Sequence, residues 1–220
     1  MKSFISYTLA FLLVIFLLSG AYLTFYGYET ARFNRMIAKE LEKKDPNAYI
    51  KLEKIKIKLD LKNLKIFLKV KQPKLKYQNI NIPFEDVKLY YKLLSLIKAK
   101  PELNKLILNF NKFEINEIQK IAVIIKPSNF KSYLLNNIKN GNVAKSTVEL
   151  TFFPSLKVKS YKFNGRVEKT NIKIKEKVSL NNINFNFVVD EKIFLINAIA
   201  ANFKNIKITE GKINVNRKNQ

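Results

Sequence analysis

The sequence predicts a mainly β protein with an N-terminal transmembrane helix and a curled antiparallel sheet, an open β-groove, that carries one or two short helices. Three observations lead to this fold class. Residues 3–28 contain no charge, apolar residues alternate with lysines through much of the remaining chain, and helical spacing is confined to short segments. With 47% hydrophobic and 26% charged residues, the chain is also too apolar to be disordered. We therefore expect an anchor in residues 1–28, a juxtamembrane helix in residues 29–47 and a β-rich domain in residues 48–220.

The uncharged N-terminal span is long enough to cross a bilayer, which needs about 20 residues, and inside lipid it must be a helix. Its alternative is a cleaved signal peptide, with Lys2 as a minimal basic region and Ser19-Gly20-Ala21 as the cleavage site. Aromatic residues that continue as far as Tyr28 favour an uncleaved anchor. The centre of the predicted anchor is Phe11, Leu12, Leu13, Val14, Ile15, Phe16, Leu17 and Leu18.

Charge on the two sides of the span bears on its orientation. Lys2 precedes the span, whereas five basic residues follow it closely, so the positive-inside rule places the body in the cytoplasm. Long domains are translocated largely regardless of charge, and lysine pervades this entire chain, so the rule is less informative than usual. The expected topology therefore depends on the family resemblance given below.

After the span, the segment from Glu29 to Lys44 predicts a short helix that ends at Asp45-Pro46-Asn47. Its apolar residues recur at helical spacing: Phe33, Met36, Ile37 and Leu41. The short apolar face indicates a cap or a juxtamembrane stalk.

The first strong strand pattern predicts a β-hairpin in residues 55–70. If Lys62-Asn63 is a two-residue turn, Leu61 lies opposite Leu64 and Ile55 opposite Val70, which puts all aliphatic residues of the hairpin on one face. Because Lys-Asn is a poor two-residue turn, a longer loop that keeps the same parity is the alternative.

Period-two alternation continues downstream and predicts further strands around residues 75–77, 80–82, 87–93, 106–110, 148–152, 172–174, 180–189, 206–208 and 213–215. Two segments are expected to be helical, Leu93 to Lys98 and Ser128 to Lys139, where Ser128 is a candidate N-cap. The apolar run from Ile121 to Ile125 fits either a helix or a strand.

The predicted sheet has one lysine-bearing face and one apolar face, and an apolar face must be covered. Either the apolar residues form the closed core of a β-sandwich or of a sheet packed on the Ser128 to Lys139 helix, or they line an open trough offered to lipid acyl chains. Periodicity does not separate these alternatives. The candidate lining residues are Ile55, Ile57, Leu59, Leu61, Leu64, Ile66, Leu68, Val70, Leu89, Tyr91, Leu106, Leu108, Phe185 and Phe187.

The composition excludes most catalytic chemistry. There is no histidine, cysteine or tryptophan, which removes imidazole bases, thiolate nucleophiles, disulfides and Cys/His metal sites. The carboxylates Glu85-Asp86, Glu102 and Asp190-Glu191 are isolated among lysines, and the five glycines form no phosphate-binding loop. We expect no catalytic residue, no metal and no cofactor, and therefore no enzyme.

The net charge of +24 raises the question of a nucleic-acid partner. Of the 41 basic residues 37 are lysines, scattered singly, and arginine, the side chain best suited to phosphate and guanine, occurs only four times. We expect no nucleic-acid partner. The lysines are expected to solvate the outer face of the sheet, with attraction of phosphate headgroups as the alternative.

A family resemblance lies in residues 87–108, VKLYYKLLSLIKAKPELNKLIL. This segment looks like the strand, the Leu-Ser-Leu-Leu-Lys-Gly-Lys-Pro-like turn and the following strand near the start of AsmA-like proteins, the group that contains AsmA, TamB and YhdP. Residues 164–167 and 182–187 are similar to later strands of that group. Ala99 stands where the family commonly has glycine, and family members are usually far longer than this chain.

The resemblance implies a single-pass bacterial inner-membrane protein with its body in the periplasm and a β-rich groove that carries phospholipids between the two membranes. Its implied partners are membrane phospholipids, the inner membrane, and further groove repeats or an envelope partner protein, and it implies no cofactor. The alternative function is a membrane-tethered scaffold or outer-membrane assembly factor that acts through β-strand edges without lipid transfer.

Overall fold

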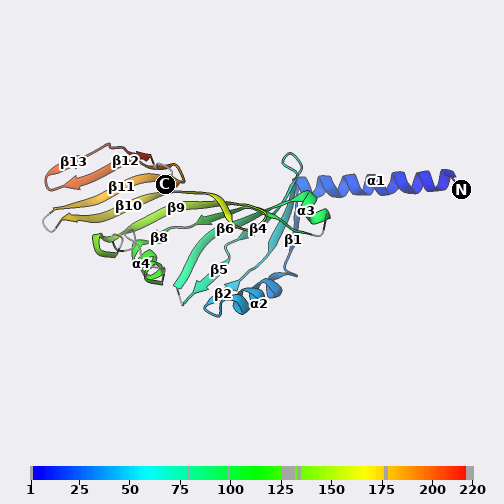
Figure 1. Ribbon diagram of the computed structural model, residues 1–220, viewed down its shortest axis with the longest axis horizontal. Helices are drawn as coiled ribbons and strands as arrows, with labels where there is room; N and C mark the ends of the chain where they lie inside the picture. Colours follow the sequence, from blue (N-terminus) through cyan, green and yellow to red (C-terminus); the bar gives the residue numbers. More distant parts are fainter. Residues whose placement is uncertain are drawn as a thin grey trace.

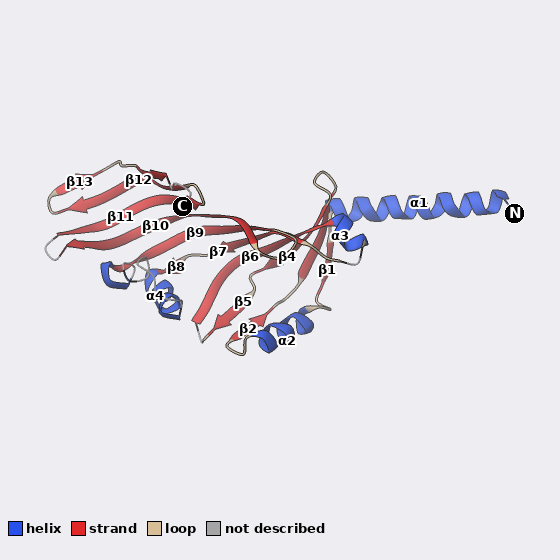
Figure 2. Ribbon diagram, viewed as in Figure 1, coloured by secondary structure: helices blue, strands red, loops and turns tan. Residues whose placement is uncertain are grey.

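The computed structural model describes residues 2–78, 80–98, 100–124, 132, 135–175 and 178–216. A long apolar helix projects from one end of an open antiparallel sheet, and only short helices accompany the strands (Figures 1 and 2). The predicted fold class is confirmed. The prediction had one or two short helices beside the sheet, and the described residues contain α2, α3, α4 and further helical residues at 132 and 135–137.

Helix α1, Lys2–Phe25, contains the predicted anchor. Its 24 residues extend over about 36 Å, compared with about 30 Å for a bilayer core. The 22 residues from Phe4 to Phe25 form a helix long and apolar enough to span a membrane, and none of its best apolar window is buried inside the protein. The core helix of a water-soluble domain would be largely buried, so α1 is not such a helix.

The chain passes from α1 into strand β1, Tyr28–Thr30, which pairs with the edge of the sheet. The predicted start of the juxtamembrane helix at Glu29 is therefore wrong, because residues 28–30 are hydrogen-bonded to strand β3 and α2 begins only at Asn34 (Asn34–Lys44). Gly27 is required at the junction. Its φ is +77°, and an added Cβ would lie 2.8 Å from the carbonyl oxygen of Ile57.

All described strand pairs are antiparallel, and the sheet path is β1-β3-β4-β6-β7-β9-β10-β11-β12-β13. Off this path, β2 pairs with β5, β5 with β6, β8 with β9 and β14 with β12. The remaining strands are β2 (Ala48–Lys51), β3 (Ile55–Asp60), β4 (Lys65–Lys71), β5 (Lys74–Tyr77), β6 (Ile80–Lys92), β7 (Leu103–Phe110), β8 (Phe113–Glu114), β9 (Ile138–Phe152), β10 (Val158–Lys175), β11 (Val178–Asp190), β12 (Ile193–Phe203), β13 (Ile206–Ile208) and β14 (Ile213–Asn216).

The β3–β4 hairpin has the predicted register, with Ile55 opposite Val70 and Leu59 opposite Ile66. The connection is the longer alternative, a four-residue turn in residues 61–64. Asp60 stabilises this turn, because its carboxylate accepts hydrogen bonds from the backbone N–H of Asn63 at 3.1 Å and from the Asn63 side chain at 2.8 Å.

Two helices lie between strands. The predicted helical turn at Leu93 is α3, Leu93–Ile97, and the ambiguous run that starts at Ile121 belongs to α4, Ile115–Ile124. Half of the predicted helix from Ser128 to Lys139 lies outside the described residues, and the described residues 132 and 135–137 are helical as predicted. Its predicted end is wrong, since Ile138 and Lys139 already belong to β9.

Helix α4 covers one region of the sheet. It contacts β8 and β9, and the side chain of Gln119 donates a hydrogen bond to the carbonyl of Ile138 at 2.7 Å. The buried core cluster is formed here, from α4 and from strands β8 to β11: Phe113, Ile115, Val143, Val167 and Phe187.

No second sheet faces this one in the described part of the chain. All fourteen described strands belong to one hydrogen-bonded sheet, and this sheet is open rather than closed on itself (Figures 1 and 2). The β-sandwich alternative is therefore not what the chain adopts. In the described residues the buried cluster lies beneath α4, Ile55 and Val70 are buried apart from it, and most of the remaining apolar face is half-buried on an open sheet.

Candidate functional site

The candidate site is the apolar face of the open sheet, and the register shows how it is assembled. One residue from each of nine strands stands beside the next across the sheet, and every member of this set is apolar. We call it the apolar row: Ile55, Val70, Val87, Leu108, Val148, Phe163, Val189, Phe194 and Val215. With strands about 4.8 Å apart, the eight steps of the row extend over roughly 38 Å.

A second, shorter set runs parallel to the apolar row on the same face: Ile57, Leu68, Leu89, Leu106, Leu150 and Tyr161. Together the two sets make a band two side chains wide. Along most of these strands the apolar residues of the band alternate with polar ones on the other face, with apolar exceptions that include Phe67, Ile107 and Leu195. The band is thus a direct consequence of the period-two pattern and the antiparallel registers.

Exposure within the band varies. Ile55 and Val70 at its start are buried, at 3% and 6% exposure, whereas most central members are half-buried and Phe163 is 36% exposed. A closed core would bury the central residues as completely as Val167, at 7%. The centre of the face is therefore covered by its neighbours in the sheet and by little else.

Most of the predicted lining residues lie where the sequence placed them. Ile57, Leu59, Ile66, Leu68, Leu89, Tyr91, Leu106 and Leu108 share the apolar face and are half-buried. Burial raises the pKa of the Tyr91 hydroxyl. Phe185 and Phe187 share the same face, but Phe187 belongs to the core cluster and Phe185 packs against it.

Two predicted lining residues lie elsewhere. Leu61 and Leu64 occupy the turn between β3 and β4 and are 51% and 55% exposed. The sequence indicated the correct parity, but the longer turn removes both residues from the strands. They lie at the end of the face rather than on it.

Six members of the apolar row were not among the predicted lining residues, and only the register places them there: Val87, Val148, Phe163, Val189, Phe194 and Val215. The sequence could have indicated that Phe163 lies on this face, since Tyr161, Phe163 and Val167 recur at even spacing. Phe194 had no such signal, because it stands in the unbroken apolar run from Ile193 to Ile196 and its face is set only by pairing with Val189.

The opposite face is polar and internally paired. Asp86 in β6 is buried and lies 3.0 Å from the ammonium of Lys69 and 3.9 Å from that of Lys88. The side chain of Asn109 donates to Asp86 at 2.7 Å, and Thr147 in turn donates to Asn109 at 2.9 Å. Burial opposes ionisation, but the hydrogen bonds from Lys69 and Asn109 and the charge of Lys88 outweigh it and lower the pKa of Asp86. The carboxylate thus holds two lysines to the outer face.

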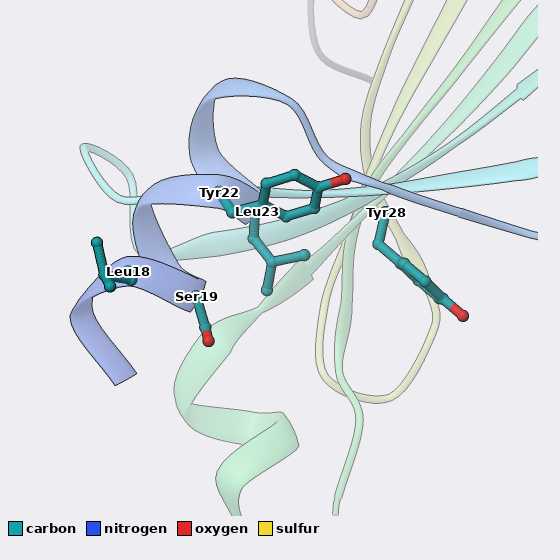
Figure 3. A pocket seen from close by; sticks show the side chains of 5 residues that line it. All are labelled: Leu18, Ser19, Tyr22, Leu23 and Tyr28. Atoms are coloured by element: carbon teal, nitrogen blue, oxygen red, sulfur yellow. The ribbon is translucent and has the colours of Figure 1, made fainter. Parts of the chain in front are cut away.

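A shallow hollow lies where α1 meets the sheet. It has a volume of about 520 Å³ and is lined by Leu18, Ser19, Tyr22, Leu23 and Tyr28 (Figure 3). The rings of Tyr22 and Tyr26 stack with centroids 5.7 Å apart. The hollow is therefore mostly apolar and joins the last turns of the helix to the first strand.

Among the described residues, no group of three or more Asp or Glu side chains is placed to hold a metal ion. Comparisons with protein-family models, curated proteins and solved structures found no match. Helix α1 and the apolar face of the sheet are therefore the two features that indicate a function.

Proposed function

We propose that the protein is a membrane-anchored lipid-binding protein whose apolar face shields phospholipid acyl chains, as a contribution to phospholipid transport in the cell envelope. The observation that carries this proposal is the apolar row. It crosses nine strands without a polar member, and no second layer among the described residues covers its half-buried centre.

The dimensions of the face suit an acyl chain. A phospholipid chain reaches across one leaflet, about 15 Å, so the row of roughly 38 Å is long enough for more than one chain laid along it. Removal of acyl chains from water contributes roughly 0.8 kcal/mol per CH₂. A 16-carbon chain covered on one side would thus be stabilised by roughly 6 kcal/mol. Headgroups would stay hydrated at the open edge, so binding needs no cofactor.

The position of the face next to α1 also supports the proposal. The first strand of the row, β3, contacts α1 and pairs with β1 directly after the helix. A helix embedded in a bilayer would therefore hold β3, the first strand of the face, close to the lipid. We place the helix in the bacterial inner membrane and the body in the periplasm, as the AsmA-like resemblance implies.

The experiment is a comparison of two variants on one strand. Leu106 and Ile107 are adjacent in β7, both half-buried, and belong to opposite faces. Leu106→Glu puts a carboxylate in the middle of the band, whereas Ile107→Glu puts one between Lys88 and Glu149 on the polar face. The full chain would be purified in mild detergent, and copurifying phospholipid would be extracted and quantified by mass spectrometry.

We expect phospholipid to copurify with the wild type and with Ile107→Glu and to be largely lost from Leu106→Glu, with the strand signal in circular dichroism retained in all three. Absence of phospholipid from the wild type, or equal retention in both variants, would contradict lipid binding by this face. In that case the scaffold function through sheet edges becomes the better hypothesis.

A further inference from the structure

A different surface of the protein lies at the end of the sheet from which α1 emerges. Strand β1 enters the sheet opposite Ile57 and runs toward Ile55, so the helix before it lies at the end where β3 continues into its turn. The registers place three more connections at this end, one of which is the β11–β12 turn after Asp190. Lys65 pairs with Lys92 just before α3, and β9 ends opposite the start of β10 before their turn. We call residues 61–64, 93–98 and 153–158 the proximal rim.

The proximal rim is unusually apolar for a set of turns and a short helix. Turns are normally rich in glycine, proline, asparagine and aspartate. Here the three connections of the rim instead expose large apolar side chains, with exposures of 47–62%: Leu61, Leu64, Leu94, Phe153, Leu156 and Val158. The β11–β12 turn at the same end, Glu191-Lys192, is polar and is not part of the rim. Two of the connections touch, since the backbone N–H of Leu93 donates to the carbonyl of Leu64 at 2.9 Å.

The opposite end of the sheet provides an internal comparison. Where the structure describes them, the connections there carry exposed polar residues: Gln72, Asn111, Lys112, Lys204 and Asn205. Exposed apolar exceptions there are Ile206, the first residue of β13, Phe33 and Met36 between β1 and β2, and Val123 in α4. The contrast between the two ends is therefore one between their turns, and the end with the apolar turns is the one that carries α1.

Basic residues flank the apolar side chains of the proximal rim. Lys62 lies between Leu61 and Leu64, Lys98 follows α3, and Lys157 stands between Leu156 and Val158. The ammonium of Lys159 lies 5.9 Å from the ring centre of Phe153. Apolar side chains next to cations are typical of surfaces that lie in the interface of an anionic bilayer, where the former contact acyl chains and the latter contact phosphates.

We propose that the proximal rim rests in the interfacial layer of the bilayer that holds α1. The occupant is an anionic phospholipid surface, because the rim is continuous with a membrane-spanning helix and carries complementary charge. The rim then fixes the tilt of the sheet on the membrane, which a single helix would leave free. This inference rests on the membrane anchor of the proposed function but not on lipid binding by the apolar row.

The absence of tryptophan from the chain makes a direct test possible. Single substitutions Leu61→Trp and Leu156→Trp report on the rim, Asn205→Trp on the opposite end and Phe11→Trp on the anchor. All four positions are exposed, so the fold tolerates the change. The full-length variants would be reconstituted in phosphatidylcholine–phosphatidylglycerol vesicles that contain brominated phospholipid, and tryptophan quenching would be measured.

We expect blue-shifted, quenched emission at both rim positions and at Phe11→Trp, and unquenched emission at Asn205→Trp. Quenching at the rim should persist when Leu106→Glu is added, because that substitution removes lipid from the apolar row and leaves only the bilayer as a source of quencher. It should weaken in vesicles of phosphatidylcholine alone, which lack anionic headgroups. An unquenched rim beside a quenched Phe11→Trp would overturn this inference and leave the anchor intact. A blue shift without quenching would assign the rim to a protein contact and overturn it too, and an unquenched Phe11→Trp would overturn the anchor itself.

Discussion

Ile66→Glu tests whether the face of the β3–β4 hairpin is open to solvent. Ile66 lies in β4 between Leu59 and Tyr91 and is half-buried. Full burial of an isoleucine contributes about 1.5–3 kcal/mol, so the half-buried side chain contributes about 1 kcal/mol. On an open face the introduced carboxylate stays hydrated. Allowing for the weaker β propensity of glutamate, we expect a loss of about 1–2 kcal/mol in the free energy of unfolding.

Val167→Glu provides the matched control. Val167 is 7% exposed and belongs to the core cluster beneath α4, so a carboxylate there is buried without a partner. We expect that variant to lose at least about 4 kcal/mol or to fail to fold. Since 1 kcal/mol corresponds to about 2–4 °C in the melting temperature of a chain this size, Ile66→Glu should melt only a few degrees below the wild type.

The assay is thermal and urea unfolding of the full chain in detergent, followed by circular dichroism, together with copurifying phospholipid. Ile66→Glu should retain the strand signal, show a slightly lower midpoint and carry less phospholipid. If it lost as much stability as Val167→Glu, the hairpin face would be an ordinary closed core and the argument for an acyl-chain surface there would fail.

Three further outcomes follow from the structure. Gly141→Ala should destabilise the fold by more than about 1 kcal/mol in a urea titration, because φ is +120° and the new Cβ would lie 2.8 Å from the Cα of Thr170. The control is Gly20→Ala, whose new Cβ would have nothing within 4 Å and which should have little effect. Asp86 has a lowered pKa in the folded state, so it stabilises the folded protein fully at pH values above its unfolded-state pKa of about 3.9. This stabilisation is lost as the pH falls through the folded-state pKa. Asp86→Asn should cost about 1–3 kcal/mol at neutral pH and flatten the acid limb of the stability curve; an unchanged acid limb would contradict this assignment. Helix α1 should make the chain resistant to carbonate extraction from membranes, and protease added to spheroplasts should digest the body, whereas full protection would place the body in the cytoplasm.

Several features of the structure could be predicted because they depend on local chemistry. An uncharged apolar span longer than 20 residues can satisfy its backbone in lipid only as a helix, which is how α1 was predicted. The register of β3 with β4 followed from the requirement that Ile55, Leu59, Ile66 and Val70 share one face, since a slip of one residue would turn them all outward.

Features that depend on distant pairing were not predictable. Residues 28–30 form a strand because the edge of β3 is available to them, and three residues carry too little pattern to show it. Phe194 faces the apolar row because it pairs with Val189, whereas its own segment is apolar on both faces.

The alternation in the sequence by itself determined that the sheet has one apolar face and one polar face. It did not determine whether the apolar face is covered, because a closed sandwich and an open sheet need the same period-two pattern. Only the tertiary structure decided this: α4 buries the cluster around Val167 and Phe187, whereas Leu89 and Leu106 are half-buried and no second layer formed by the described part of the chain lies over them. The physical reason is that the side-chain pattern of a strand records which face is apolar, whereas the presence of a covering layer depends on how the whole chain is arranged in space.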